Sequence, residues 1–301
     1  MQNLAKQIAD IYQAEMEAKP KARALNDVPG TYEAVTAQWL TAGLCRDTPG
    51  AVVTDFRIAD RSDGSSNRAR VLLKYNEIGQ RAGLPPTVFC KASITSKNRV
   101  VLGVLGGAKG EADIFRLVRH RLRIETPVSL HAAFDPQSYA YIIVMKDIAA
   151  TTHFCDEHTK IDRHQAEKIV DALTRLHADF YQSPELGSAS LPFMTWPQCW
   201  QGFINGFPGF AESCDKGFGL AEPYIPPRLF RRRAEIWPAT LASVERHNTL
   251  PKTLTHADVH LGNWYIAGNG DMGVTDWQGV GEIAAPVADA YALSTTLAIE
   301  N

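Results

Sequence analysis

The sequence predicts an α+β protein with two lobes, the first rich in strands and the second rich in helices. Residues 51–146 contain short apolar runs separated by turn residues, which is typical of a β-sheet. From residue 147 onward the chain is mainly helical, most clearly over residues 162–181, where apolar residues recur with helical spacing. A chain of 301 residues is long enough to bury a core in each lobe.

Composition argues against several kinds of partner. The charges nearly balance, with a formal net charge of −2, so there is no bulk electrostatic attraction to nucleic acid. No apolar run approaches the roughly 20 residues of a membrane span, and the N-terminal segment lacks the apolar core of a signal peptide. We therefore expect neither a nucleic-acid nor a membrane partner, and the sequence indicates no particular oligomeric state.

The cysteines indicate the redox compartment. There are five of them, an odd number, and no pair has the C-x-x-C spacing. This pattern favours reduced thiols in a cytoplasmic protein over a disulfide framework.

Residues 1–50 predict two helices. The first is amphipathic, with Ile8 and Ile11 on its apolar face. The second covers residues 32–44 and ends near Gly43.

The first two strands, residues 51–59 and 69–75, are joined by a polar loop over residues 60–68 that contains glycine and serine. Such a loop lets backbone N–H groups approach phosphate oxygens closely, although most turns of this composition are only turns. The residues that would contact phosphate are Gly64, Ser65, Ser66 and Asn67.

A third strand, residues 87–92, carries Lys91 near its end. A lysine at this place, in the sheet that follows such a loop, matches the lysine that holds the ATP phosphates in kinase-like folds. The alternatives are that Lys91 is a surface side chain on an edge strand, or that Lys74 takes the role instead.

The glycine-rich residues 103–110 are not expected to bind phosphate. A Walker loop needs Gly before its Lys and Ser or Thr after it, whereas Lys109 lies between Ala and Gly. We expect a flexible connector there, followed by a helix over residues 111–123 that opens with Glu111. An early helical Glu is the expected partner of the strand lysine, or else it only stabilises the helix dipole.

Two further strands, residues 130–134 and 138–145, lead into the helical half. The long helix over residues 162–181 contains His177, for which packing is the expected role. Residues 183–230 are rich in Pro, Gly and aromatic residues, so they cannot form one regular helix.

The residues best suited to chemistry surround a small hairpin near the C-terminus. Two apolar runs, residues 264–267 and 272–275, flank an Asn-Gly pair, which is a strong hairpin signal. Asp258, Asn263 and Asp276, at the close of the second strand, are therefore expected at one end of this hairpin. Phosphoryl transfer needs a carboxylate that accepts the proton of the attacking hydroxyl, and oxygen ligands that hold Mg²⁺. This trio supplies both.

The sequence His256-Ala257-Asp258-Val259-His260-Leu261-Gly262-Asn263, followed by Asp276-Trp277-Gln278, resembles the catalytic and metal motifs of the aminoglycoside phosphotransferase and choline kinase superfamily. It is most similar to the ecdysteroid-kinase-like branch. The resemblance implies a two-lobed protein-kinase-like fold, with an antiparallel sheet plus helix in the small lobe and a larger, mainly helical lobe. Ala257 stands where the family usually has Gly.

The resemblance also implies an activity: ATP-dependent transfer of the γ-phosphoryl group to a hydroxyl of a small molecule, with Mg²⁺. In this reading Asp258 is the catalytic base and His256 fixes its loop. Asn263 and Asp276 hold the metal. Lys91, supported by Glu111, places the phosphates together with the Gly- and Ser-rich loop. The hinge that binds adenine would comprise Met145, Asp147 and Ile148.

Three regions follow from the resemblance. Residues 1–50 would be helices that pack on the small lobe, residues 51–146 the nucleotide-binding small lobe, and residues 147–301 the catalytic and acceptor-binding lobe. Related proteins continue with further helices, so a chain truncated at Asn301 is expected. Asp289 resembles the family residue that anchors the backbone of the catalytic loop.

Two other functions stay open on the sequence. His256-x-Asp258-x-His260 has the spacing of alternate zinc ligands on one strand face, as in a metallohydrolase. A nucleotide-binding pseudokinase without turnover would keep the same fold, although the complete Asp258, Asn263 and Asp276 set argues against it.

Overall fold

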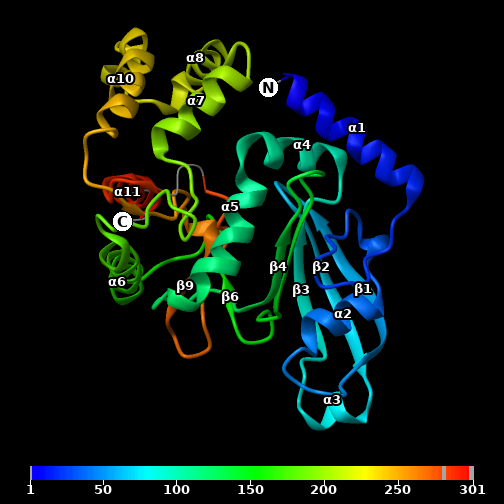
Figure 1. Ribbon diagram of the computed structural model, residues 1–301. Helices are drawn as coiled ribbons and strands as arrows, with labels where there is room; N and C mark the ends of the chain where they lie inside the picture. Colours follow the sequence, from blue (N-terminus) through cyan, green and yellow to red (C-terminus); the bar gives the residue numbers. More distant parts are fainter. Residues whose placement is uncertain (1, 280–282, 298–301) are drawn as a thin grey trace.

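The structure is a computed structural model, in which residues 2–279 and 283–297 are described (Figure 1). A five-stranded antiparallel sheet lies on one side of the molecule, and helices make up most of the other side. The strand order is β1-β2-β3-β5-β4, which confirms the predicted α+β class. The bounds are β1 (Val53–Asp63), β2 (Asn67–Tyr75), β3 (Thr87–Ala92), β4 (Ser129–Phe134) and β5 (Tyr141–Lys146).

The turn between β1 and β2 is shorter than predicted. The strands continue through most of the polar loop, so that Ser62 pairs with Arg68 and only residues 64–66 remain in the turn. A register shift between Ala59 and Ser62 allows this pairing. The polar composition of the segment gave no sign of it, because the end of β1 is exposed and the start of β2 buries the polar Asn67.

The prediction of a flexible connector at residues 103–110 is wrong. Helix α4 (Ser96–Leu105) ends at Gly106, whose φ of 77° is the left-handed conformation that glycine adopts easily, and α5 (Gly107–Asp113) begins at once. Ala108 and Ala112 are fully buried, so tertiary packing holds this glycine-rich segment helical. Glu111 therefore lies inside α5 and does not open a helix.

After α5 the predicted helix over residues 111–123 changes character. It continues as a π-helical turn, Ile114–Val118, and a 3₁₀ turn, Arg119–Arg121. Helices α3 (Glu77–Arg81) and α4 were not predicted, since residues 51–101 were expected to be sheet.

The N-terminal region packs on the sheet and on α4. Helix α1 (Gln2–Ala18) lies against α4, where Arg99 Nη1 is 2.6 Å from Glu15 Oε2. The predicted helix over residues 32–44 is divided into a 3₁₀ turn, Tyr32–Ala34, and α2 (Ala37–Leu44). The division occurs because the Thr36 backbone is extended, while its side chain caps α2.

The long helix of the second half is confirmed as α6 (Arg163–Phe180). Asp162 caps it in a reciprocal capping box with Gln165. The remaining helices are α7 (Trp196–Gly206), α8 (Phe210–Leu220), α9 (Pro227–Phe230), α10 (Arg233–Arg246) and α11 (Val287–Leu297), with a 3₁₀ turn at Glu222–Tyr224. Within the described ranges, none of the helices has the length and apolarity to cross a membrane.

The C-terminal hairpin is confirmed, with slightly shorter strands than predicted. It consists of β8 (Trp264–Ile266) and β9 (Met272–Val274), and β6 (His153–Phe154) pairs with β8. Asp276 lies two residues beyond β9 and does not belong to the strand. A second small sheet pairs β7 (Thr253–Leu254) with β10 (Ile283–Ala284). The predicted truncation at Asn301 falls outside the described residues.

Candidate active site

A cavity of about 290 Å³ lies between the five-stranded sheet and the C-terminal hairpin. One wall comes from β2 and β3, a second from the end of β5 and the segment after it, and a third from the loops around β8 and β9. The lining residues used below are Arg68, Arg70, Lys91, Met145, Asp147, Ile148, Asn263 and Asp276.

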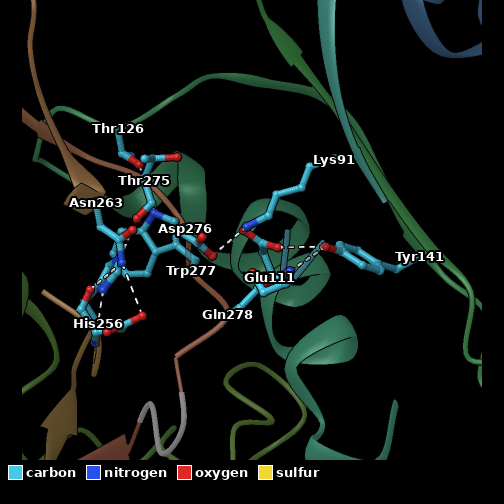
Figure 2. Close-up of polar contacts among 12 residues, drawn as sticks. Lys91, Glu111, Thr126, Tyr141, His256, Asn263, Thr275, Asp276, Trp277 and Gln278 are labelled. Atoms are coloured by element: carbon cyan, nitrogen blue, oxygen red, sulfur yellow. Dashed lines mark hydrogen bonds and ion pairs between the residues drawn. The ribbon is translucent and has the colours of Figure 1, made fainter. Parts of the chain in front are cut away.

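Lys91 joins the two sides of this cavity (Figure 2). Its Nζ lies 2.6 Å from Glu111 Oε1 in α5 and 2.7 Å from Asp276 Oδ1 beyond β9. Lys91 is 5% exposed and Glu111 only 1%, so both are shielded from solvent. Lys74, the alternative lysine, is exposed and paired with Asp55, away from the cavity.

The two carboxyl groups beside Lys91 differ in their pKa. Burial raises the pKa of Glu111, although the charge of Lys91 opposes the rise. Burial also acts to raise the pKa of Asp276, but Lys91 outweighs it, and the pKa of this carboxyl lies below its ordinary value. Asp276 therefore stays ionised at the cavity surface at neutral pH.

The polar network continues through two residues that the sequence did not single out as site residues. Tyr141 donates a hydrogen bond to Glu111 Oε2 at 3.2 Å, and Gln278 Nε2 donates to the Tyr141 hydroxyl at 2.6 Å (Figure 2). Ser65 Oγ, at the tip of the β1–β2 hairpin, donates to Gln278 Oε1 at 3.1 Å. The sheet, α5 and the segment after β9 are thus linked by one chain of hydrogen bonds.

The predicted nucleotide loop lies near the cavity but does not line it. Gly64 N–H donates to Ser66 O at 2.9 Å, which closes the tight turn. The Asn67 side chain bonds to Asp63 Oδ1 and accepts from the backbone of Ile94, so its polar atoms are already used in the fold. Ser66 Oγ is buried and has no hydrogen-bond partner among the described residues.

The predicted hinge does line the cavity, through Met145, Asp147 and Ile148. Arg70 of β2 donates from Nε to Asp147 Oδ2 at 2.6 Å, and it also pairs with Asp60. Burial acts to raise the pKa of Asp147, but the hydrogen bond from Arg70 outweighs it, and the pKa is lowered. The Asp147 carboxylate is thus held by the sheet, a contact that the sequence did not reveal.

His256 is a buried member of the loop that carries Asp258. Its Nε2–H donates to Thr275 O at 2.9 Å, and its Nδ1 accepts from Asp258 N–H at 3.4 Å. Burial lowers the pKa of His256, so the ring is neutral at neutral pH. It therefore connects the loop before the hairpin to the segment after β9, while the Asp258 side chain remains exposed.

Asp289 of α11 holds the same loop from the other side. Its carboxylate accepts from His256 N–H at 2.9 Å and from Ala257 N–H at 2.7 Å, and His177 Nε2 lies 2.8 Å from it. Ala257 has φ of 67° and Asp276 has φ of 62°, a conformation that is costly for residues with a Cβ. This explains why glycine suits position 257.

Comparison with known proteins decides the family. The phosphotransferase enzyme family matches residues 104–295, which is more than half of the chain. The chain belongs to this phosphotransferase family. The two-lobed, protein-kinase-like α+β fold expected from the sequence agrees with that membership and with the observed sheet and helices.

Several solved structures are similar to this phosphotransferase. An aminoglycoside phosphotransferase from Streptomyces rimosus is 16% identical, covers 87% of this chain and 83% of its own, and has a TM-score of 0.45. An aminoglycoside-3'-phosphotransferase of type VIII is 18% identical, covers 84% of this chain and 80% of its own, and has a TM-score of 0.46. The choline kinase of Streptococcus pneumoniae is 13% identical, covers 82% of this chain and 70% of its own, and has a TM-score of 0.43. No curated protein matches the chain in a sequence comparison.

The side chains of the phosphotransferase offer oxygen atoms suited to a magnesium ion. Asn263 Nδ2 donates to Asp258 O at 2.8 Å, so the amide oxygen Oδ1 of Asn263 points away from Asp258 O. No described residue donates a hydrogen bond to Asn263 Oδ1. Asp276 uses Oδ1 for Lys91 and has a second carboxylate oxygen. Both residues line the cavity, so their donor set fits Mg²⁺, which prefers carboxylate and carbonyl oxygens and keeps several waters.

The arrangement does not favour a zinc site at the His256-x-Asp258-x-His260 motif. Both ring nitrogens of His256 are engaged by backbone groups, so neither is available to a metal in this conformation. No group of three or more His, Cys, Asp or Glu side chains is arranged as a metal site in the part of the chain that the structure describes.

Proposed function

We propose that the protein transfers the γ-phosphoryl group of ATP to a hydroxyl of a small molecule, with Mg²⁺. Membership of the phosphotransferase family supports the reaction class. The observation that carries the residue assignment is that Lys91 and Asp276 meet in one cavity with Asn263 and the hinge residues. A kinase needs this arrangement, because a lysine and metal ligands must reach the same phosphates.

In this proposal the sheet side of the cavity holds the nucleotide. Lys91 contacts the phosphates, and Glu111 keeps the lysine in place. The backbone around Met145, Asp147 and Ile148 binds adenine. The turn residues Gly64, Ser65 and Ser66, with Asn67 at the start of β2, lie above the phosphates. This placement of the turn is supported by the hydrogen bond of Ser65 with Gln278, which lies two residues beyond Asp276.

The hairpin side performs the chemistry. Asn263 and Asp276 hold Mg²⁺, which neutralises charge on the phosphates when bound. The acceptor oxygen attacks the γ-phosphorus, the bond to the ADP oxygen breaks, and the hydroxyl proton passes to the Asp258 carboxylate. His256 and Asn263 orient the loop that carries Asp258. Such a base contributes roughly 10²–10⁴-fold to the rate.

Finer assignments extend the proposal. The His256 to Gln278 motif supports the ecdysteroid-kinase-like branch, and the reduced cysteines support a cytoplasmic location. We assign residues 1–50 to helices that support the small lobe, residues 51–146 to nucleotide binding, and residues 147–301 to catalysis and acceptor binding. One structural neighbour, from Streptomyces rimosus, is a complex with ADP and streptomycin. A hydroxyl-bearing small molecule is the corresponding acceptor proposed for this chain.

The test is an ATP-consumption screen across hydroxyl compounds with wild type, Asp258→Ala and Asp271→Ala. Asp271 is an exposed carboxylate at the far end of the same hairpin, paired with Lys168, and makes a matched control. We expect turnover to fall about 10²–10⁴-fold only in Asp258→Ala. Turnover at the wild-type rate in that variant would contradict the assignment.

Thermal unfolding gives an independent readout. Mg·ADP at about 100 times its Kd should stabilise the fold by about 2.7 kcal/mol, in wild type and in Asp258→Ala alike. At roughly 2–4 °C per kcal/mol for a domain of this size, the shift in Tm is measurable. A shift with zinc and none with nucleotide would favour the metallohydrolase. Nucleotide binding without turnover of any acceptor would favour the pseudokinase.

A further inference from the structure

We propose that Arg68 is a second phosphate-binding cation of the cavity, and this inference rests on the proposed function. Arg68 lies on β2 directly opposite Lys91 of β3 in the antiparallel register. Directly paired residues project from the same face of a sheet. Both side chains line the same cavity, so they reach one ligand from neighbouring strands.

The charge of Lys91 is already balanced within the protein. Its ammonium contacts two carboxylates, Glu111 and Asp276, at 2.6 and 2.7 Å. A triphosphate that enters this site therefore meets no surplus positive charge from Lys91. A further cation on the protein side of the phosphates would supply positive charge that Lys91 does not.

Arg68 has such a surplus charge. In the described part of the chain it forms no ion pair, whereas the next cation on the same face, Arg70, pairs with Asp147 and Asp60. Arg68 Nε is buried and has no hydrogen-bond partner among the described residues. A buried donor without a partner is destabilising, and a phosphate oxygen would supply the missing acceptor. Lys146 also lines the cavity and pairs with no acidic residue within the described ranges, but its side chain is exposed.

The position of the guanidinium also fits the predicted phosphate turn. A Cβ on Gly64 would lie 2.5 Å from Arg68 Nη2, so the guanidinium packs directly against the tip of the hairpin. Glycine at this position makes room for it. The planar fork of an arginine can bind two phosphate oxygens through parallel N–H···O bonds of fixed geometry, which the flexible ammonium of Lys91 does not provide.

The experiment compares Arg68→Gln with Lys74→Gln. Both changes remove one positive charge from β2, and Lys74 is exposed and paired with Asp55 at the other end of the strand. Binding of Mg·ADP, AMP and adenosine is measured by calorimetry. Arg68→Gln should weaken Mg·ADP about 10- to 100-fold, as expected for a charged hydrogen bond, and leave adenosine unchanged. Lys74→Gln should bind all three like wild type.

Each outcome decides the inference. Wild-type affinity of Arg68→Gln for Mg·ADP would overturn it and leave the proposed function standing. An equal loss for ADP and adenosine would show that Arg68 only supports the fold, and would overturn it as well. Failure of wild type to bind Mg·ADP would overturn the proposed function and, with it, this inference. Arg68→Met keeps the aliphatic stem and provides the same comparison if Arg68→Gln does not fold.

Discussion

Lys91 Nζ lies 2.7 Å from Asp276 Oδ1, although the two residues are 185 positions apart and belong to the sheet and to the segment beyond β9. The same ammonium contacts Glu111, so one buried cation serves two carboxylates. Removing one member of a buried ionic group costs more than the group itself contributes, because the remaining charges stay buried without compensation.

Lys91→Met should therefore destabilise the fold by about 3–5 kcal/mol near neutral pH. Without the lysine, the pKa of Glu111 rises further and the lowering of the pKa of Asp276 by Lys91 is lost, so the folded state takes up a proton that the unfolded state does not. Stability of the variant relative to wild type should then increase as pH falls from about 8 toward about 5. Denaturant unfolding of the variant and of wild type at both pH values measures this difference in the free energy of unfolding. Glu111→Gln added to Lys91→Met should restore much of the loss; no restoration would contradict the explanation.

Asp289→Asn tests the anchor of the loop that carries Asp258. The backbone N–H groups of His256 and Ala257 both need an acceptor, and an asparagine offers only one oxygen. We expect a loss of about 1–3 kcal/mol in the free energy of unfolding and a lower kcat. The KM for ATP should change little, since Asp289 does not line the cavity that holds Lys91 and Asp276. A variant with unchanged kcat would show that the anchor does not position Asp258.

Gly279→Ala should disturb the same loop by steric overlap. A Cβ at this position would lie 2.0 Å from His256 O, a backbone atom that cannot move alone. Overpacking of this kind costs about 1–3 kcal/mol. Gly202→Ala in α7 is the control, because a Cβ there meets nothing within 4 Å. The two variants should differ in Tm and in turnover, and equal behaviour would refute the clash.

His131 should make the fold sensitive to mild acid. Burial lowers its pKa from 6.5 to about 4, with a smaller contribution from Arg46. Between these values the unfolded chain binds a proton that the folded protein does not, so stability falls as pH drops from 6.5 toward 4. The loss reaches at most about 3 kcal/mol. His131→Phe should flatten this part of the stability curve. An unchanged slope would show that other groups cause it.

Elements with a complete local signal could be predicted from the sequence. Helix α6 has an Asp162 cap, a Gln165 partner and a regular apolar face, and its observed ends differ from the predicted ones by one residue. The hairpin of β8 and β9 was found because Asn-Gly fixes the turn locally. In contrast, the glycines before Glu111 gave a misleading local signal, since burial of Ala108 and Ala112 holds the segment helical.

The residues of the candidate site likewise fall into those that the sequence could reveal and those that it could not. Asp258, Asn263 and Asp276 lie close together in sequence, so their motif could be recognised without knowledge of the fold. Tyr141, Gln278 and Arg68 could not, because their relevance depends on contacts between strands and loops that are remote in sequence. The pairing of Arg68 with Lys91 requires the register of β2 and β3, which neither strand encodes alone.

The six tryptophans are divided between two environments, and this gives the molecule two optical reporters. Trp39, Trp264 and Trp277 are almost fully buried in the cores, whereas Trp196, Trp200 and Trp237 form a half-buried aromatic cluster on α7 and α10. Emission from the cluster should lie at longer wavelength, because water reaches its rings. Loosening of these outer helices would therefore be visible in the fluorescence spectrum before the sheet and the C-terminal hairpin unfold.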